Sequence, residues 1–277
     1  MLFLVSAGLQ LVFGVQRILN LACGSFYALG AYAGVSAVGW ALGAGMPPPL
    51  FLAVLVATGA LLAVIGPPVE RVLRTIYDRD EAFQLLLTFA LVLVFEDVIR
   101  FFWGTAPHQL GNVYLVYGQV RIGETTVPVY NLVVIAAGGL IALGMGWFLA
   151  RTRFGRIVRA TAENREMSEA LGVDMSRVYT RVFTLGVALG TIGGALVIPA
   201  TAAINEMGIE LIVEAFAVVV IGGLGSMRGA FVGALIVGVL KGVAIATWPE
   251  LEMLAIYVIV IAVLVARPAG LFAKETA

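Results

Sequence analysis

The sequence predicts an all-α polytopic membrane protein with eight or nine transmembrane helices, some of them short or broken. Three observations lead to this prediction. Of the 277 residues, 61% are hydrophobic and 12% are charged, whereas a soluble domain has about 25% charged residues. The mean hydropathy is +1.03. Apolar runs long enough to cross the roughly 30 Å hydrocarbon core of a bilayer recur along the whole chain.

Nine apolar segments are expected to be helices, because a chain in lipid must satisfy its backbone hydrogen bonds within each segment. The segments are too long, and their polarity alternates too weakly, for strands of a barrel. The short connections leave no room for a large soluble domain, so residues 1–277 are predicted to form one transmembrane domain. The segments cover residues 1–16, 24–42, 50–69, 82–103, 129–150, 182–200, 211–224, 229–247 and 251–266.

The positions of Lys and Arg predict the orientation, since short basic loops stay in the cytoplasm. Arginines concentrate at residues 70–81 and 151–181, whereas the connection at 104–128 has Arg121 as its only basic residue apart from neutral His108. Two predicted helices separate the two basic loops, which therefore share a side. The N-terminus is expected outside and the C-terminus in the cytoplasm.

Several function classes are excluded by residues that the chain lacks. The single cysteine rules out an internal disulfide, and the single histidine argues against a His-based metal site, so no metal or cofactor is expected. No Walker motif and no His-Glu-x-x-His motif occurs, so neither ATP hydrolysis nor metalloprotease chemistry is expected of this chain. The net charge of zero, without a long basic run, gives no sign of nucleic-acid binding.

The stretch at residues 155–174 is predicted to be a short amphipathic helix in the cytoplasm. Glu163, Glu166, Met167 and Ala170 follow helical spacing, and Gly172 suits a left-handed C-terminal cap. Such a helix could dock into a groove on a partner protein. A solvated basic loop that only fixes the topology is the equally weighted alternative.

Charged residues inside the apolar segments predict an ion pair. An unpaired charge at the centre of a membrane helix costs at least about 2.5–3.5 kcal/mol. Glu214 precedes, and Lys241 follows, the turn near residues 224–229, and at 1.5 Å per residue they lie roughly 15 and 18 Å from it. We therefore predict that the two side chains pair and link two helices structurally. Glu96 and Arg100 have the spacing for a second pair, on one helix.

Three stretches carry a resemblance to a known family. They are residues 14–24 (GVQRILNLACG), 155–173 (GRIVRATAENREMSEALGV) and 215–230, which ends in GGLGSMRGA. In this order they are similar to the permeases of branched-chain amino acid ABC importers, over nearly the whole chain. The chain departs from the family at Cys23, where histidine is common, and has less sequence before the first helix.

The resemblance implies a bacterial inner-membrane permease subunit that has no ATPase site of its own. Its implied partners are a second, homologous or identical permease, two cytoplasmic ATPase subunits, a periplasmic binding protein and membrane lipid. The middle stretch would insert into an ATPase subunit, which makes Glu163, Asn164, Ala170 and Gly172 the coupling candidates. Small and weakly polar residues are expected to line the substrate passage, namely Asn20, Ser25, Gly223, Gly225 and Ser226.

Two other functions stay open at this point. Urea or short amides could replace branched-chain amino acids as the substrate, because related permeases share the architecture. A secondary transporter driven by protons or sodium would need an acidic residue near the midplane. Glu214 is the one candidate for that role, and a partner at Lys241 would keep it charged.

Overall fold

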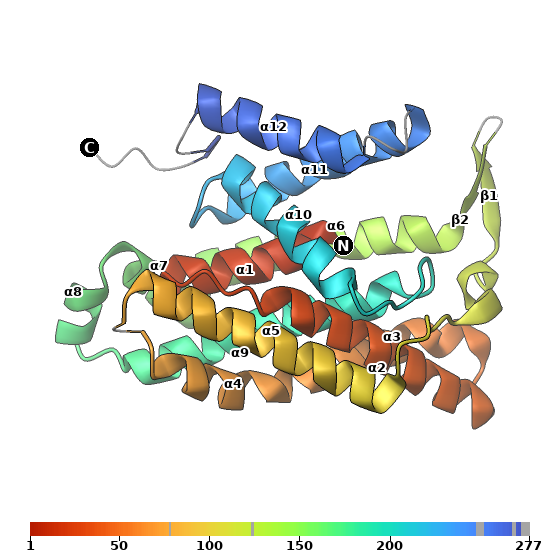
Figure 1. Ribbon diagram of the computed structural model, residues 1–277, viewed down its shortest axis with the longest axis horizontal. Helices are drawn as coiled ribbons and strands as arrows, with labels where there is room; N and C mark the ends of the chain where they lie inside the picture. The colour runs from red at the N-terminus through yellow and green to blue at the C-terminus, as the bar shows by residue number, and fades with distance from the viewer. Residues whose placement is uncertain (78, 123–124, 248–251, 268–269, 273–277) are drawn as a thin grey trace.

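The computed structural model shows a bundle of helices that run roughly along one long axis (Figure 1). It describes residues 1–77, 79–122, 125–247, 252–267 and 270–272. The α-helices are α1 (Leu2–Gln16), α2 (Cys23–Gly43), α3 (Phe51–Leu62), α4 (Gly66–Arg74), α5 (Glu81–Trp103), α6 (Val129–Arg151), α7 (Arg153–Glu163), α8 (Arg165–Ala170), α9 (Met175–Val197), α10 (Met207–Gly222), α11 (Met227–Thr247) and α12 (Glu252–Ala266).

Shorter elements complete the described chain. Single 3₁₀ turns occur at η1 (Pro48–Leu50), η2 (Ala63–Ile65) and η3 (Gly111–Leu115). Strands β1 (Gln119–Ile122) and β2 (Thr125–Pro128) pair antiparallel, with Gln119 opposite Pro128. They lie at the end of the bundle away from α8 (Figure 1).

The all-α polytopic class is confirmed, but the number of crossings is not. Six helical segments in the described residues are at least 18 residues long and apolar enough to cross a membrane; α3 and α4 are joined into one of them, at Pro48–Arg74. Among the described residues, eight of the nine predicted segments each fall on one helix, and the segment at 50–69 spans α3, η2 and the start of α4. However, α1, α10 and α12 have only 15 or 16 residues. Eight or nine crossings therefore stays a prediction.

Helix α9 forms the centre of the bundle, with α1, α2, α3 and α4 packed against it. Glycines let α2 and α9 approach closely, because a Cβ atom at Gly30 would collide with the carbonyl group of Thr191, and one at Gly194 with that of Tyr27. Helix α1 runs antiparallel to α9, since Leu4 lies against Gly193, Gly8 against Gly186, and Gln16 hydrogen-bonds to Tyr179. Small residues at helix contacts are expected where lipid removes the hydrophobic drive for association.

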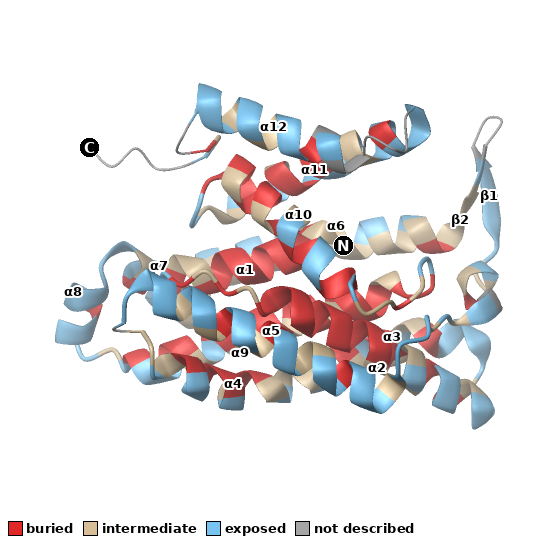
Figure 2. Ribbon diagram, viewed as in Figure 1, coloured by how far each residue is buried: buried red, intermediate tan, exposed pale blue. Residues whose placement is uncertain are grey.

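Most residues of α5 and α6 are exposed or only partly buried (Figure 2), and many of the exposed ones are large and apolar. None of the 18 residues in the most apolar window of α6 is buried. A surface of this kind suits a lipid environment, because hydrocarbon solvates it as well as a protein core does. On α6 the exposed large apolar side chains are Leu132, Ile135, Leu140, Leu143 and Trp147.

The two basic connections lie at the same end of the bundle, as the charge pattern predicted. The rings of Tyr77, between α4 and α5, and Tyr179, at the start of α9, meet edge to face with centroids 5.4 Å apart. The described residues of the connection at 104–128, which include β1 and β2, lie at the opposite end (Figure 1). Which end faces the cytoplasm, and hence the side of each terminus, stays a prediction.

The prediction of one cytoplasmic helix at 155–174 was wrong, because the chain forms two. Asn164 has an extended backbone, with φ −148° and ψ 101°, which ends α7 and starts α8. The predicted loop at 151–181 is also largely helical. Helix α9 begins at Met175 rather than at residue 182, because Asp174 caps it by accepting a hydrogen bond from Arg177 N at 3.1 Å.

Replacing Gly194 with Leu should prevent the packing of α2 on α9. The new side chain would meet the backbone of Tyr27, and overpacking of this kind costs about 1–3 kcal/mol or more. We expect a lower thermal-unfolding temperature and a smaller monodisperse fraction in detergent. Gly39→Leu is the matched control, since nothing lies within 4 Å of a Cβ atom there. Equal behaviour of the two variants would contradict the packing account.

Candidate coupling site and substrate passage

Helices α7 and α8 form a segment, residues 153–172, at one end of the bundle, with α7 packed on the bundle and α8 extending beyond it (Figure 1). Side chains cap both helices. Thr152 Oγ1 accepts from Gly155 N at 3.0 Å, and Asn164 Oδ1 accepts from Met167 N at 2.9 Å. Gly172 follows α8 with φ +84°, the left-handed region that favours glycine. Local hydrogen bonds therefore fix the shape of the α7–α8 segment.

The four coupling candidates all lie on the α7–α8 segment, and all four are exposed. Glu163 ends α7, Asn164 separates the two helices, and Ala170 ends α8 just before Gly172. The structure adds Leu171, which sequence reasoning missed and whose side chain is 78% exposed. Met167, four residues earlier on α8, is 58% exposed as well, so two large apolar side chains of this segment are exposed.

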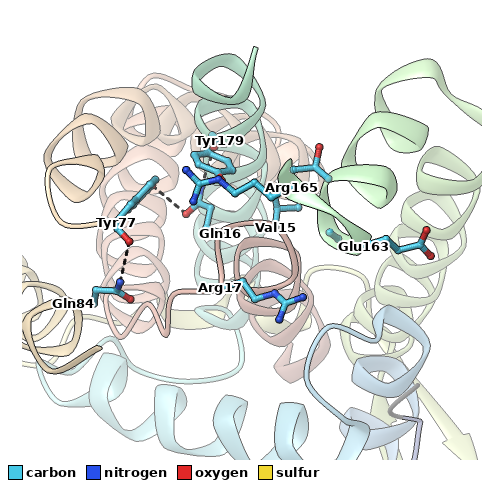
Figure 3. Close-up of a pocket in the computed structure, with 10 residues that line it drawn as sticks. Val15, Gln16, Arg17, Tyr77, Gln84, Glu163, Arg165 and Tyr179 are labelled. Atoms are coloured by element: carbon cyan, nitrogen blue, oxygen red, sulfur yellow. Dashed lines mark hydrogen bonds between the residues drawn. The ribbon is translucent and has the colours of Figure 1, made fainter. Parts of the chain in front are cut away.

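A cavity of about 240 Å³ lies between the α7–α8 segment and the end of α1 (Figure 3). Five parts of the chain meet there: the end of α1, the α4–α5 connection, α5, α7–α8 and α9. The cavity therefore marks the junction between the α7–α8 segment and the bundle. Its lining residues are Val15, Gln16, Arg17, Tyr77, Gln84, Thr161, Ala162, Glu163, Arg165 and Tyr179.

Three of these residues, which we call the Tyr77 cluster, tie α1 to its neighbours: Gln16, Tyr77 and Tyr179. Gln16 Nε2 donates to the carbonyl oxygen of Tyr179 at 3.1 Å, and the Tyr77 hydroxyl donates to Gln16 Oε1 at 3.2 Å. The Arg165 guanidinium group, from α8, lies 5.5 Å from the ring centroid of Tyr179. The cluster therefore connects α8 to α1 through α9.

Glu70 anchors the same end of the bundle although its side chain is fully buried. Arg74 forms a salt bridge with it, and Thr180 Oγ1 donates to it at 2.8 Å. The Tyr77 hydroxyl lies 3.2 Å from it and shares its one proton between Glu70 and Gln16. A buried carboxylate is tolerated when it is paired and hydrogen-bonded in this way. Burial, and then the charge of Glu70, raise the pKa of the Tyr77 hydroxyl, which therefore stays a neutral donor.

The passage candidates fall into two groups. Asn20 and Ser25 are buried beside the start of α2, and Asn20 Oδ1 accepts from Ala22 N at 3.1 Å. The second group belongs to the turn between α10 and α11, residues 223–226. No hydrogen bond joins the two groups within the part of the chain that the structure describes. Helix α1 contacts the turn, because a Cβ atom at Gly14 would lie 3.8 Å from the Cα atom of Gly225.

Glu214 and Lys241 lie within contact distance. Lys241 Nζ is 2.6 Å from Glu214 Oε1, which joins α10 to α11. The side chain of Lys241 is 31% exposed and that of Glu214 is 16% exposed, so both charges are largely enclosed. Glu96 and Arg100 also form a salt bridge, at the far end of α5.

Sequence comparison decides the family. The family described as "Branched-chain amino acid transport system / permease component" matches residues 1–264. The chain belongs to this family. Members of the branched-chain amino acid permease component family are transport subunits rather than catalytic enzymes, and the apolar helices of this chain agree with a multi-pass membrane protein.

Curated permeases align over most of the chain. BraD of Pseudomonas aeruginosa, a high-affinity branched-chain amino acid permease, is 23% identical and covers 98% of this chain and 91% of its own. LivH of Escherichia coli, with the same description, is 25% identical with the same coverage. The ribose import permease RbsC of Escherichia coli is 26% identical and covers 86% of this chain and 72% of its own. No solved structure matches the chain.

Exchanging the charges of Glu214 and Lys241 tests their structural role. Glu214→Lys or Lys241→Glu alone puts two like charges together among apolar helices, where an unpaired charge costs about 2.5–3.5 kcal/mol. We expect each single variant to lose thermal stability in detergent and the double variant to regain most of it. If the double variant were no more stable than the less stable single variant, the structural role of the pair would be contradicted.

Proposed function

We propose that the chain is the membrane-spanning permease subunit of a bacterial ABC importer for branched-chain amino acids, located in the inner membrane. The family match over residues 1–264 carries this proposal. The relatives named for branched-chain amino acids align over 98% of the chain, which favours that substrate class over ribose, urea or short amides. A periplasmic binding protein would deliver the substrate to a passage between two permease subunits.

In this proposal two cytoplasmic ATPase subunits grip the α7–α8 segments. Glu163 and Asn164 offer polar contacts at the bend, while Ala170 and Gly172 are small enough for a groove wall to approach closely. The exposed side chain of Leu171 supplies an apolar anchor beside them. The α7–α8 segment is thus a docking element with a fixed shape.

Movement of the α7–α8 segment has a direct route to the membrane helices. Arg165 contacts Tyr179, and Gln16 of α1 hydrogen-bonds to the backbone of the same residue. Residues 17–22 connect α1 to α2. Two passage candidates lie here, Asn20 in the connection and Ser25 at the start of α2. ATP-driven movement of the docked segment would therefore bias α1 between two positions, as alternating access requires.

A secondary transporter driven by an ion gradient is the weaker candidate. Its expected proton or sodium ligand is Glu214, and that carboxylate is occupied by Lys241 at 2.6 Å. A carboxylate that already forms a salt bridge would have to give up that partner before it could bind a transported ion. The α7–α8 segment would also have no role in such a transporter.

Reconstitution tests the proposed function. The chain is purified with its second permease and ATPase subunits, placed in proteoliposomes and supplied with the binding protein and radiolabelled leucine. We expect uptake that requires ATP and the binding protein and that excess isoleucine or valine competes away. Uptake by this chain alone, driven by an ion gradient without ATP, would overturn the proposal. Uptake of urea in place of leucine would overturn the substrate class.

Gly172 offers a test of the coupling role. Gly172→Val forces a β-branched residue to φ +84°, which costs about 1–2 kcal/mol, or bends the α7–α8 segment. We expect the variant to reach the membrane but to transport less leucine per ATP hydrolysed. Gly172→Asn is the matched control, because asparagine tolerates the left-handed region. Equal coupling in both variants would contradict the docking role.

A further inference from the structure

Two buried polar side chains lie on one face of α1. Ser6 and Gln10 are four residues apart, which places them one above the other on a helix. Ser6 is 0% exposed and Gln10 is 2% exposed, within a helix that is otherwise apolar except at Gln16, its last residue. Neither residue belongs to the sequence-predicted passage.

Gln10 holds α1 against the turn between α10 and α11. Its Nε2 atom donates to the carbonyl oxygen of Gly223 at 2.6 Å and to that of Ser226 at 3.0 Å. Positive φ angles of +93° at Gly223 and +83° at Gly225 give the turn its shape. A single carboxamide thus connects two parts of the chain that are more than two hundred residues apart.

Ser6 and Gln10 each keep one buried polar atom without a hydrogen-bond partner among the described residues. The two atoms are Gln10 Oε1 and Ser6 Oγ. Nearly all buried polar groups in folded proteins are paired, because an unpaired one loses its hydration without compensation. An amide oxygen can only accept, and a hydroxyl group can accept as well as donate. Gln10 Oε1 therefore lacks a hydrogen-bond donor, and Ser6 Oγ can accept from the same donor.

We propose that Ser6 and Gln10 form a substrate-binding site within the passage, which we call the Ser6–Gln10 site. Gln10 Oε1 and Ser6 Oγ accept hydrogen bonds from the ammonium group of an amino acid in transit. The proposal rests on the proposed transport function. It adds a ligand chemistry, a small solute with N–H donors, and two residues that neither the family match nor the sequence motifs assign.

The site is closed in this structure and opens when α1 leaves the turn. The bonds from Gln10 to Gly223 and Ser226 keep the passage shut on this side of α1. Gln16, which belongs to the Tyr77 cluster, lies six residues along the same helix, about 9 Å away at 1.5 Å per residue. Movement of the α7–α8 segment is therefore transmitted through Gln16 and along α1 to the Ser6–Gln10 site.

Cysteine accessibility tests the site in the complete complex. Cys23 is the chain's only cysteine, so Cys23→Ser gives a background without reactive thiols. Ser6→Cys, Gln10→Cys and, as the matched control, Leu9→Cys are introduced one at a time; Leu9 is 1% exposed on the same helix. A small charged thiol reagent is applied to proteoliposomes with the binding protein, with and without ATP, and with and without excess leucine.

We expect ATP to speed labelling of Ser6→Cys and Gln10→Cys and excess leucine to slow it, while Leu9→Cys stays unlabelled. In addition, Gln10→Leu should lower leucine uptake about tenfold, which corresponds to about 1.4 kcal/mol, whereas Leu9→Met should leave it unchanged. The low uptake of Gln10→Leu should come with ATP hydrolysis that no longer depends on leucine.

Three results would overturn the Ser6–Gln10 site. The first is that neither Ser6→Cys nor Gln10→Cys is labelled in any state. The second is that leucine does not slow their labelling. The third is that Leu9→Cys is labelled as fast as they are. Each applies to a complex whose unmodified form imports leucine with ATP, so the site can fail while the transport function stands. Failure of the unmodified complex to import any amino acid would instead remove the proposed function.

Discussion

The close contact of α9 with α1, α2, α3 and α4 is the interaction on which the rest of the structure depends. Lipid provides no hydrophobic force between helices, so van der Waals contact between small residues has to hold them. Gly194 of α9 lies against the backbone of Tyr27, and Gly186 against Gly8. This contact sets the position of α1, which reaches the Tyr77 cluster at one end and the α10–α11 turn along its length.

Two enclosed carboxylates of the bundle, Glu70 and Glu214, are both paired with a basic side chain. Glu70 is buried among Arg74, Thr180 and Tyr77, and Glu214 contacts Lys241. Pairing lowers the cost of enclosing these groups. The proposed passage residues are uncharged, which fits the proposed amino-acid substrate, a zwitterion that must bind briefly and leave. Gln10 is a buried neutral group that is also hydrogen-bonded, to the turn between α10 and α11. In our proposal these bonds break when α1 leaves the turn.

Local sequence pattern predicted the helices well and the long-range contacts poorly. All nine apolar segments fall on helices, and the contact of Glu214 with Lys241 follows from their similar distance to one turn. The break at Asn164 was missed, although Asn is a common N-cap residue and signals such a break. Gln10 was missed because two isolated polar residues do not alter an apolar run. The spacing of Ser6 and Gln10 was the available signal, but their contact with residues 223–226 depends on packing across the whole fold.

The central claim is that a cytoplasmic ATPase subunit grips the α7–α8 segment. The most direct measurement is site-specific crosslinking from position 171 in the Cys23→Ser background, using Leu171→Cys in the reconstituted complex and mass spectrometry of the product. The account predicts a crosslink to the ATPase subunit and labelling of this position from the cytoplasmic side only. Labelling from the periplasmic side, or a complex that hydrolyses ATP without any such crosslink, would contradict it.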